Sequence, residues 1–100
     1  MGWVKDALKE LSKNGSCQIR PQGGSMRGRI ESGQLVTIEK IKPEEIKIED
    51  AALVKWKGNY LLHIIKEINE NEVLIGNNLG KINGWIPIRD VIGKVVKVED

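Results

Sequence analysis

Residues 51–65 read AALVKWKGNYLLHII and predict two strands joined by a short hairpin. Gly58 and Asn59 form the expected connection, because glycine and asparagine tolerate the positive φ angles of tight hairpin turns. The return strand, 60–68, is apolar on both faces around His63. Such a pattern is typical of a strand in the centre of a sheet.

Further strands are expected on both sides of this hairpin. Residues 34–41 alternate between apolar and polar side chains, as a half-buried strand does. Isoleucine and valine supply most of the apolar side chains and phenylalanine is absent, a choice that favours strands. Residues 76–84 are rich in asparagine and glycine and are expected to be a loop. The remaining strands are predicted at 18–20, 51–57, 73–75 and 92–98.

The N-terminal segment has a different period. Trp3, Val4, Ala7, Leu8 and Leu11 recur every three or four residues, and Asn14-Gly15 follows as a stop signal. The sequence therefore predicts a single domain, 1–100, of the mainly β class. An amphipathic helix at 1–15 is expected to cover a β domain of six or seven strands at 16–100.

Composition excludes several classes of protein. The net charge is +2 with acids and bases interspersed, so there is no basic footprint for nucleic acid. Cys17 is the single cysteine, which excludes an internal disulfide and suits a reducing compartment. No run approaches the roughly 18 apolar residues that a membrane span needs, and no residue spacing calls for a metal or another cofactor. We expect a cytoplasmic protein of unknown oligomeric state.

Residues 23–28, GGSMRG, place Ser25 on a glycine-flanked loop. Glycines let a substrate approach the backbone and leave N–H groups free to bind an oxyanion. A serine hydroxyl becomes a good nucleophile only when a nearby base takes its proton. His63, the only histidine, lies in an apolar strand where burial favours the neutral ring that can act as that base. On these residues alone, a turn serine and a core histidine are the more common explanation of the pattern.

The order of the segments resembles that of the signal peptidase family of serine peptidases. The Ser-Met dipeptide is followed by a strand opened by Gly33-Gln34, and a second strand follows Asp50. His63 then stands where bacterial members have a general-base lysine and the archaeal and endoplasmic-reticulum branch has a histidine. The later segments 75–78 and 86–96 resemble the Gly-Asp-Asn box and the closing segment of the family.

The resemblance implies a fold and a set of roles. It implies the all-β catalytic core shared with the self-cleaving SOS-type repressors, with Ser25 as nucleophile and His63 as base. The backbone at Gly24, Ser25 and Met26 would bind substrate and the oxyanion, with Met26 packed beneath the site. Gly23 stands where relatives can carry a helping hydroxyl, so the backbone amides would act without it.

The chain departs from the family pattern where a carboxylate would orient the histidine. No acid lies between Glu72 and Asp90. Asn77 or Asn78 could hold the imidazole as a neutral partner, and Asp90 could do so if its loop folds back. Nearby lysines are alternative bases, but Lys66 is expected on the opposite strand face from His63 and the other two, Lys55 and Lys57, look solvated.

The sequence therefore predicts a serine endopeptidase that processes a soluble precursor or leader peptide through a Ser-His dyad. The peptide would add as an edge strand, with small side chains near the cleaved bond, as the resemblance implies. The alternative is an inactive or weakly active domain of the same fold that binds a peptide or protein partner. A transcriptional regulator related to the SOS-type repressors is a third interpretation, for which a single N-terminal helix is too little to form a helix-turn-helix.

Overall fold

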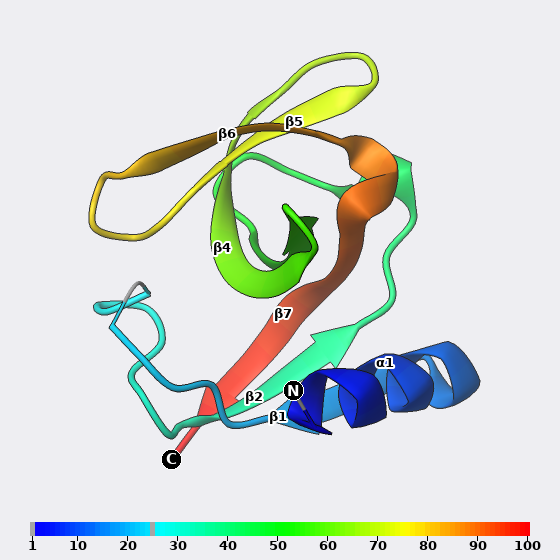
Figure 1. Ribbon diagram of the computed structural model, residues 1–100, viewed down its shortest axis with the longest axis vertical. Coiled ribbons are helices and arrows are strands. Elements are labelled where there is room, and N and C mark those ends of the chain that lie inside the picture. Colours follow the sequence, from blue (N-terminus) through cyan, green and yellow to red (C-terminus); the bar gives the residue numbers. More distant parts are fainter. Residues whose placement is uncertain (1, 25) are drawn as a thin grey trace.

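The protein is a mainly β domain with one N-terminal helix, as expected (Figure 1). The structure is a computed structural model that describes residues 2–24 and 26–100. Its described residues form a single antiparallel sheet of seven strands in the order β1-β2-β7-β3-β4-β5-β6. The strands are β1 (Ser16–Ile19), β2 (Leu35–Glu39), β3 (Ala51–Trp56), β4 (Asn59–Ile68), β5 (Glu72–Gly76), β6 (Ile82–Pro87) and β7 (Val91–Glu99). Short 3₁₀ turns, η1 (Pro43–Glu45) and η2 (Ile88–Asp90), precede β3 and β7.

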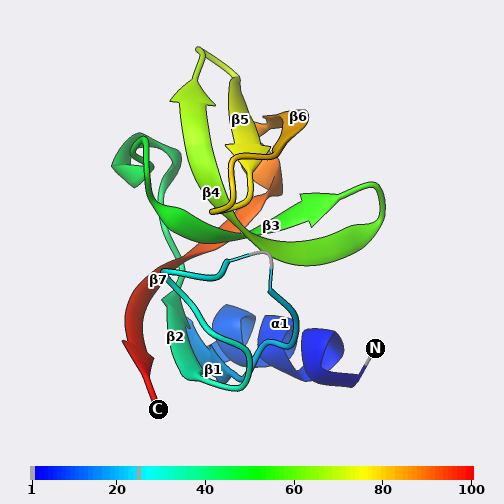
Figure 2. The ribbon, with the colours of Figure 1, turned by 90° about the vertical axis from the view of Figure 1, so that its left-hand side faces the viewer.

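Helix α1 (Gly2–Asn14) packs on β1, and Figure 2 shows it beside the β1–β2 pair, at the opposite end of the molecule from the β5–β6 hairpin. Ala7 and Leu11 are buried there, and the N–H of Gly15 donates to the Leu11 carbonyl where the helix ends. With 13 residues, α1 is too short to cross a bilayer, and no other described helix has the length and apolarity to do so.

The central hairpin forms as predicted, with its turn shifted by one residue. Lys57 and Gly58 both have positive φ angles, of 49° and 81°, and Asn59 already pairs with Trp56. Two-residue hairpin turns of this kind match the right-handed twist of the strands. Strand β4 lies between β3 and β5, which confirms the central position that its two apolar faces predicted.

Strand β6 corrects the prediction that residues 76–84 are a loop. The strand begins at Ile82 and is antiparallel to β5. Ile82 is the partner of Gly76 at one end, and Pro87 is the partner of Glu72 at the other. It lies at the edge of the sheet, where one side of the backbone needs no partner strand. Polar residues, glycine and proline are therefore tolerated there. Because these residue types are also typical of loops, the composition of the segment did not indicate a strand.

The buried side chains form two clusters because alternate residues of β3 and β4 point to opposite faces. Leu53 and Ile64 belong to the first cluster, which lies between the sheet and α1. Val54 and Ile65 belong to the second, together with residues from β5, β6 and β7. Figure 2 shows the segment between β1 and β2 lying between α1 and the β3–β4 hairpin. This segment, residues 20–34, contains Ser25 and is called the serine loop below.

Candidate active site around His63 and the serine loop

The serine loop is held against the first core cluster by two apolar side chains. Met26 and Ile30 are 4% and 3% exposed, and the Ile30 N–H donates to the Met26 carbonyl across one helical turn. Because residues four apart lie on the same face of such a turn, both side chains point into the core. The expectation that Met26 packs beneath the site fits this burial. Ser25 itself lies outside the described residues.

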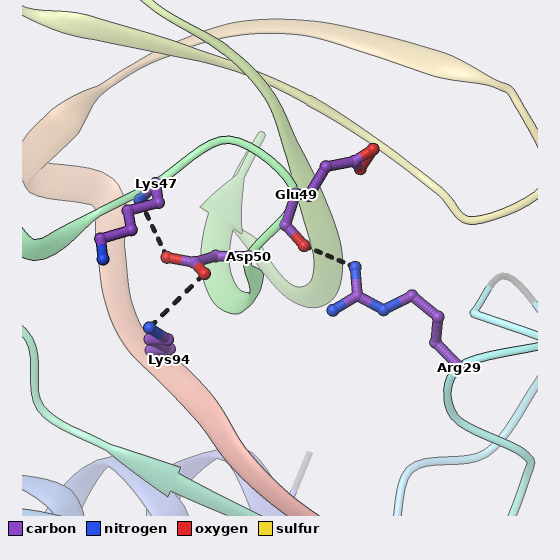
Figure 3. Close-up of polar contacts among 5 residues, drawn as sticks. All are labelled: Arg29, Lys47, Glu49, Asp50 and Lys94. Carbon is purple, nitrogen blue, oxygen red and sulfur yellow. Dashed lines mark hydrogen bonds and ion pairs between the residues drawn. The ribbon is translucent and has the colours of Figure 1, made fainter.

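Two long-range hydrogen bonds fix the outer side of the loop. Nη1 of Arg29 donates to the Glu49 carbonyl just before β3, at 2.6 Å (Figure 3). Nδ2 of Asn78, in the β5–β6 connection, donates to the Arg27 carbonyl at 2.8 Å. Residues 26–30 are thus attached to two different parts of the sheet.

The turn that receives Arg29 is itself well supported. Glu49 has a φ angle of 78°, and its N–H donates to the Ile65 carbonyl of β4. Asp50 accepts the Lys47 N–H at 2.8 Å and forms an ion pair with Lys94 of β7 at 3.5 Å (Figure 3). These contacts fix the carbonyl to which Arg29 binds.

A cavity of about 300 Å³ separates the serine loop from the start of β4. The loop side consists of residues 20–23, 26 and 30–32, so the lining includes residues on both sides of Ser25 in the chain. The β4 side consists of residues 60–63. His63 and the serine loop therefore line one cavity, although they are far apart in the sequence.

His63 is the only buried polar or charged residue among those that the structure describes, at 6% exposed. Its Nδ1 makes a short hydrogen bond with the carbonyl of Leu62. A carbonyl oxygen only accepts, so Nδ1 carries the proton in this bond. In the neutral ring, Nε2 then holds the free lone pair, which is the tautomer that a general base requires.

Of the three residues expected to orient His63, Asn77 and Asn78 make other hydrogen bonds. Oδ1 of Asn77 accepts the N–H groups of Leu79 and Lys81, which closes the β5–β6 turn. Asn78 binds the serine loop, and Asp90 lies in η2. In the described part of the chain, no hydrogen bond joins any of them to His63. The role that sequence reasoning missed is that of the Leu62 carbonyl, since a backbone group leaves no signal in residue identity.

Gly76, Asn77 and Asn78 nevertheless act together. A Cβ at Gly76 would lie 2.4 Å from the Lys81 carbonyl, so only glycine fits where β6 crosses close to β5. Asn77 then forms the turn, and this turn presents Asn78 to the serine loop. The resemblance suggested that this box acts on the histidine, whereas here it supports the serine loop.

Two arginine side chains of the loop donate hydrogen bonds to backbone carbonyls. Nη1 of Arg20 donates to the Gly33 carbonyl at 2.8 Å, and Arg29 binds Glu49 as described above. The Gly24 carbonyl accepts the Arg27 N–H at 3.2 Å. Among the alternative bases, Lys55 and Lys57 are exposed and Lys66 does not line the cavity.

No protein-family model matches the sequence, and no curated protein matches it either.

Proposed function

We propose that the protein is a serine endopeptidase that processes a precursor or leader peptide, with Ser25 as nucleophile and His63 as general base. The observation that carries the proposal is the shared cavity. His63, which is buried, belongs to one wall, and the loop that contains Ser25 in the sequence forms the other. Glycines at positions 23 and 24 leave room for a peptide to approach the loop backbone.

The proposed reaction follows from the tautomer of His63. Nε2 takes the hydroxyl proton of Ser25 as Oγ bonds to the carbonyl carbon of the peptide. The proton then passes to the leaving amine as the peptide C–N bond breaks, which leaves an ester between Ser25 and the peptide. Nε2 next takes a proton from a water molecule as its oxygen bonds to the ester carbonyl carbon. The proton returns to Oγ as the ester bond breaks, which releases the carboxylic acid and restores Ser25. The Leu62 carbonyl accepts the hydrogen bond from Nδ1–H throughout, so it stabilises the imidazolium that forms.

This arrangement lacks the full charge of an orienting carboxylate. A carbonyl dipole fixes the tautomer and the ring orientation but stabilises a cation less than an anion does. We therefore expect slow turnover, suited to a single processing event rather than to bulk digestion. The oxyanion is assigned to the backbone N–H of Ser25, assisted by a neighbouring amide.

The test is cleavage of a proteome-derived peptide library, with new peptide termini identified by mass spectrometry. Wild type is compared with Ser25→Ala and His63→Ala, and Ser12→Ala on the exposed side of α1 is the matched control. Loss of a general base typically lowers kcat by about 10²–10⁴. We expect cleavage by wild type and Ser12→Ala only. Equal cleavage by all four proteins would overturn the proposal.

A serine-directed fluorophosphonate gives an independent reading, because its reaction needs an activated hydroxyl rather than a matched substrate. We expect one adduct, on Ser25, in wild type and the Ser12→Ala control. His63→Ala should react far more slowly. An adduct formed at the same rate in His63→Ala would show that His63 does not act as the base.

The second candidate is a domain that binds a peptide or protein partner without cleaving it. One observation favours it: within the described residues, no carboxylate forms a hydrogen bond or ion pair with His63. Peptide binding with no new termini and no fluorophosphonate adduct would select this function.

A further inference from the structure

We propose that the cavity between the serine loop and β4 binds a bulky, uncharged apolar side chain of a peptide, such as leucine, methionine or phenylalanine. The inference rests on the proposed function in one respect, namely that this side chain lies next to the cleaved bond. It departs from the small side chains that the resemblance implied.

The cavity is large enough for a bulky side chain. The cavity measures about 300 Å³, and an apolar protein cavity of about 150 Å³ already holds a benzene molecule. Cavities that bind small ligands start at about 300 Å³. An alanine side chain would leave most of this volume unfilled, whereas a phenylalanine or leucine side chain would make contact with several walls.

Apolar side chains line both sides of the cavity. Met26 and Ile30 line the loop side, and Tyr60 and Leu62 line the β4 side. The same four residues belong to or pack against the first core cluster. The cavity is therefore an open extension of an apolar core, so an apolar occupant would replace water there.

The polar residues that the serine loop contributes to the cavity make hydrogen bonds within the loop. Ser32 Oγ accepts the Gly23 N–H and donates to Gln22. Oε2 of Glu31 accepts the Gly28 N–H, and Arg20 binds the Gly33 carbonyl. Because these groups are engaged with the loop, a charged occupant would lose hydration without gaining a matched partner.

The experiment uses Ser25→Ala protein, so that binding is measured without turnover. The probes are blocked pentapeptides, acetyl-Ala-Ala-X-Ala-Ala-amide, in which X is alanine, leucine, phenylalanine, aspartate or lysine. Binding is followed by the methyl NMR signals of Met26, Ile30 and Leu62. We expect leucine and phenylalanine peptides to bind at least about tenfold more tightly than the alanine peptide, and to shift these signals.

Tyr60→Lys tests the cavity wall, because Tyr60 is only half-buried and its replacement spares the fully buried core. The variant should lose the preference for leucine and gain affinity for the aspartate peptide. Asn59→Lys adds the same charge to the exposed neighbouring residue, which is not part of the cavity wall. This control should keep the preference for leucine. A gain of aspartate binding cannot come from unfolding, so the result does not depend on unchanged stability.

Two outcomes separate this inference from the proposed function. Equal affinity for the alanine and leucine peptides, or the same shift in preference in both lysine variants, would overturn the binding preference even if wild type cleaves peptides. A leucine preference in a wild-type protein that cleaves none of the probes or library peptides would support the cavity assignment and overturn the proposed peptidase activity.

Discussion

Nδ2 of Asn78 donates a hydrogen bond to the carbonyl of Arg27 at 2.8 Å, across 51 residues of sequence. The bond joins the β5–β6 connection to the turn that directly follows Ser25 in the chain. It explains why an asparagine two residues after Gly76 matters without any contact to His63.

Removing this side chain should loosen the serine loop. Asn78→Ala leaves the carbonyl of Arg27 without its donor, and a lost hydrogen bond of this kind costs about 0.5–1.5 kcal/mol in the free energy of unfolding. We expect faster amide hydrogen exchange at residues 26–30, measured by mass spectrometry. Asn71→Ala removes an exposed amide next to the other end of β5. It should change neither the free energy of unfolding nor the exchange rates at residues 26–30. Unchanged exchange in Asn78→Ala would contradict the role assigned to this bond.

Gly28 is required by the same contact. Its φ angle is 96°, and a Cβ there would lie 2.9 Å from Nδ2 of Asn78. Gly28→Ala should therefore combine backbone strain with displacement of the asparagine, at a cost of about 1–3 kcal/mol in the free energy of unfolding. Chemical denaturation followed by tryptophan fluorescence measures this cost.

A matched glycine separates the two effects. Gly80 has a φ angle of 94° with no atom within 4 Å of its Cβ position, so Gly80→Ala carries the strain alone. The double variant Gly28→Ala/Asn78→Ala should be more stable than the sum of the single changes implies, because the contact is lost once rather than twice. Simple additivity would mean that the contact contributes nothing.

Arg29 supplies the second attachment of the loop. Arg29→Met keeps the aliphatic chain but removes the donor to the Glu49 carbonyl. Because the guanidinium is exposed, we expect a small loss of stability, about 1 kcal/mol or less, together with a clear fall in peptide cleavage as the loop loses its position. Arg27→Met is the control, since its backbone carbonyl still accepts from Asn78. Equal cleavage by both variants would contradict a positioning role for Arg29.

Much of the fold could be predicted from local patterns. The alternation at 34–41 and the doubly apolar strand around His63 gave β2 and the central β4, because burial imposes a period on the sequence. Strand β6 could not be found in this way. Its pairing with β5 and its position at the edge are consequences of tertiary structure, and its composition is that of a turn.

The sequence could predict which residues belong to the candidate site, but not the contacts that they make. The sequence indicated Ser25 and His63, and the fold brings the loop that contains Ser25 and the strand that contains His63 to one cavity. The partner of Nδ1 was not predictable, because any residue can offer a carbonyl. The sequence allowed either Asn77 or Asn78 to bind the histidine. In the fold, the amide of Asn77 closes the β5–β6 turn and the amide of Asn78 binds the serine loop, and neither contact can be deduced from local sequence.

Cys17 provides a prediction about pH that is independent of the site. The side chain is buried opposite Ile38, and burial raises the pKa of its thiol above the ordinary value of 9.0, with a smaller contribution from Glu10. Above pH 9 the unfolded chain therefore loses this proton while the folded protein still retains it. Unfolding then releases a proton, so the free energy of unfolding must fall as the pH rises until the folded thiol also ionises.

The measurement is urea unfolding at several pH values between 7 and 10.5, in wild type and in Cys17→Ala. The comparison isolates the thiol, because the two proteins differ only at position 17 and every other ionisable group is present in both. The variant loses apolar contacts and is less stable at every pH, yet its stability should fall less steeply above pH 9. The folded wild type should also react slowly with a thiol reagent at pH 8 and rapidly once urea unfolds it. Parallel pH profiles in the two proteins would show that the thiol ionises alike in the folded and unfolded chains.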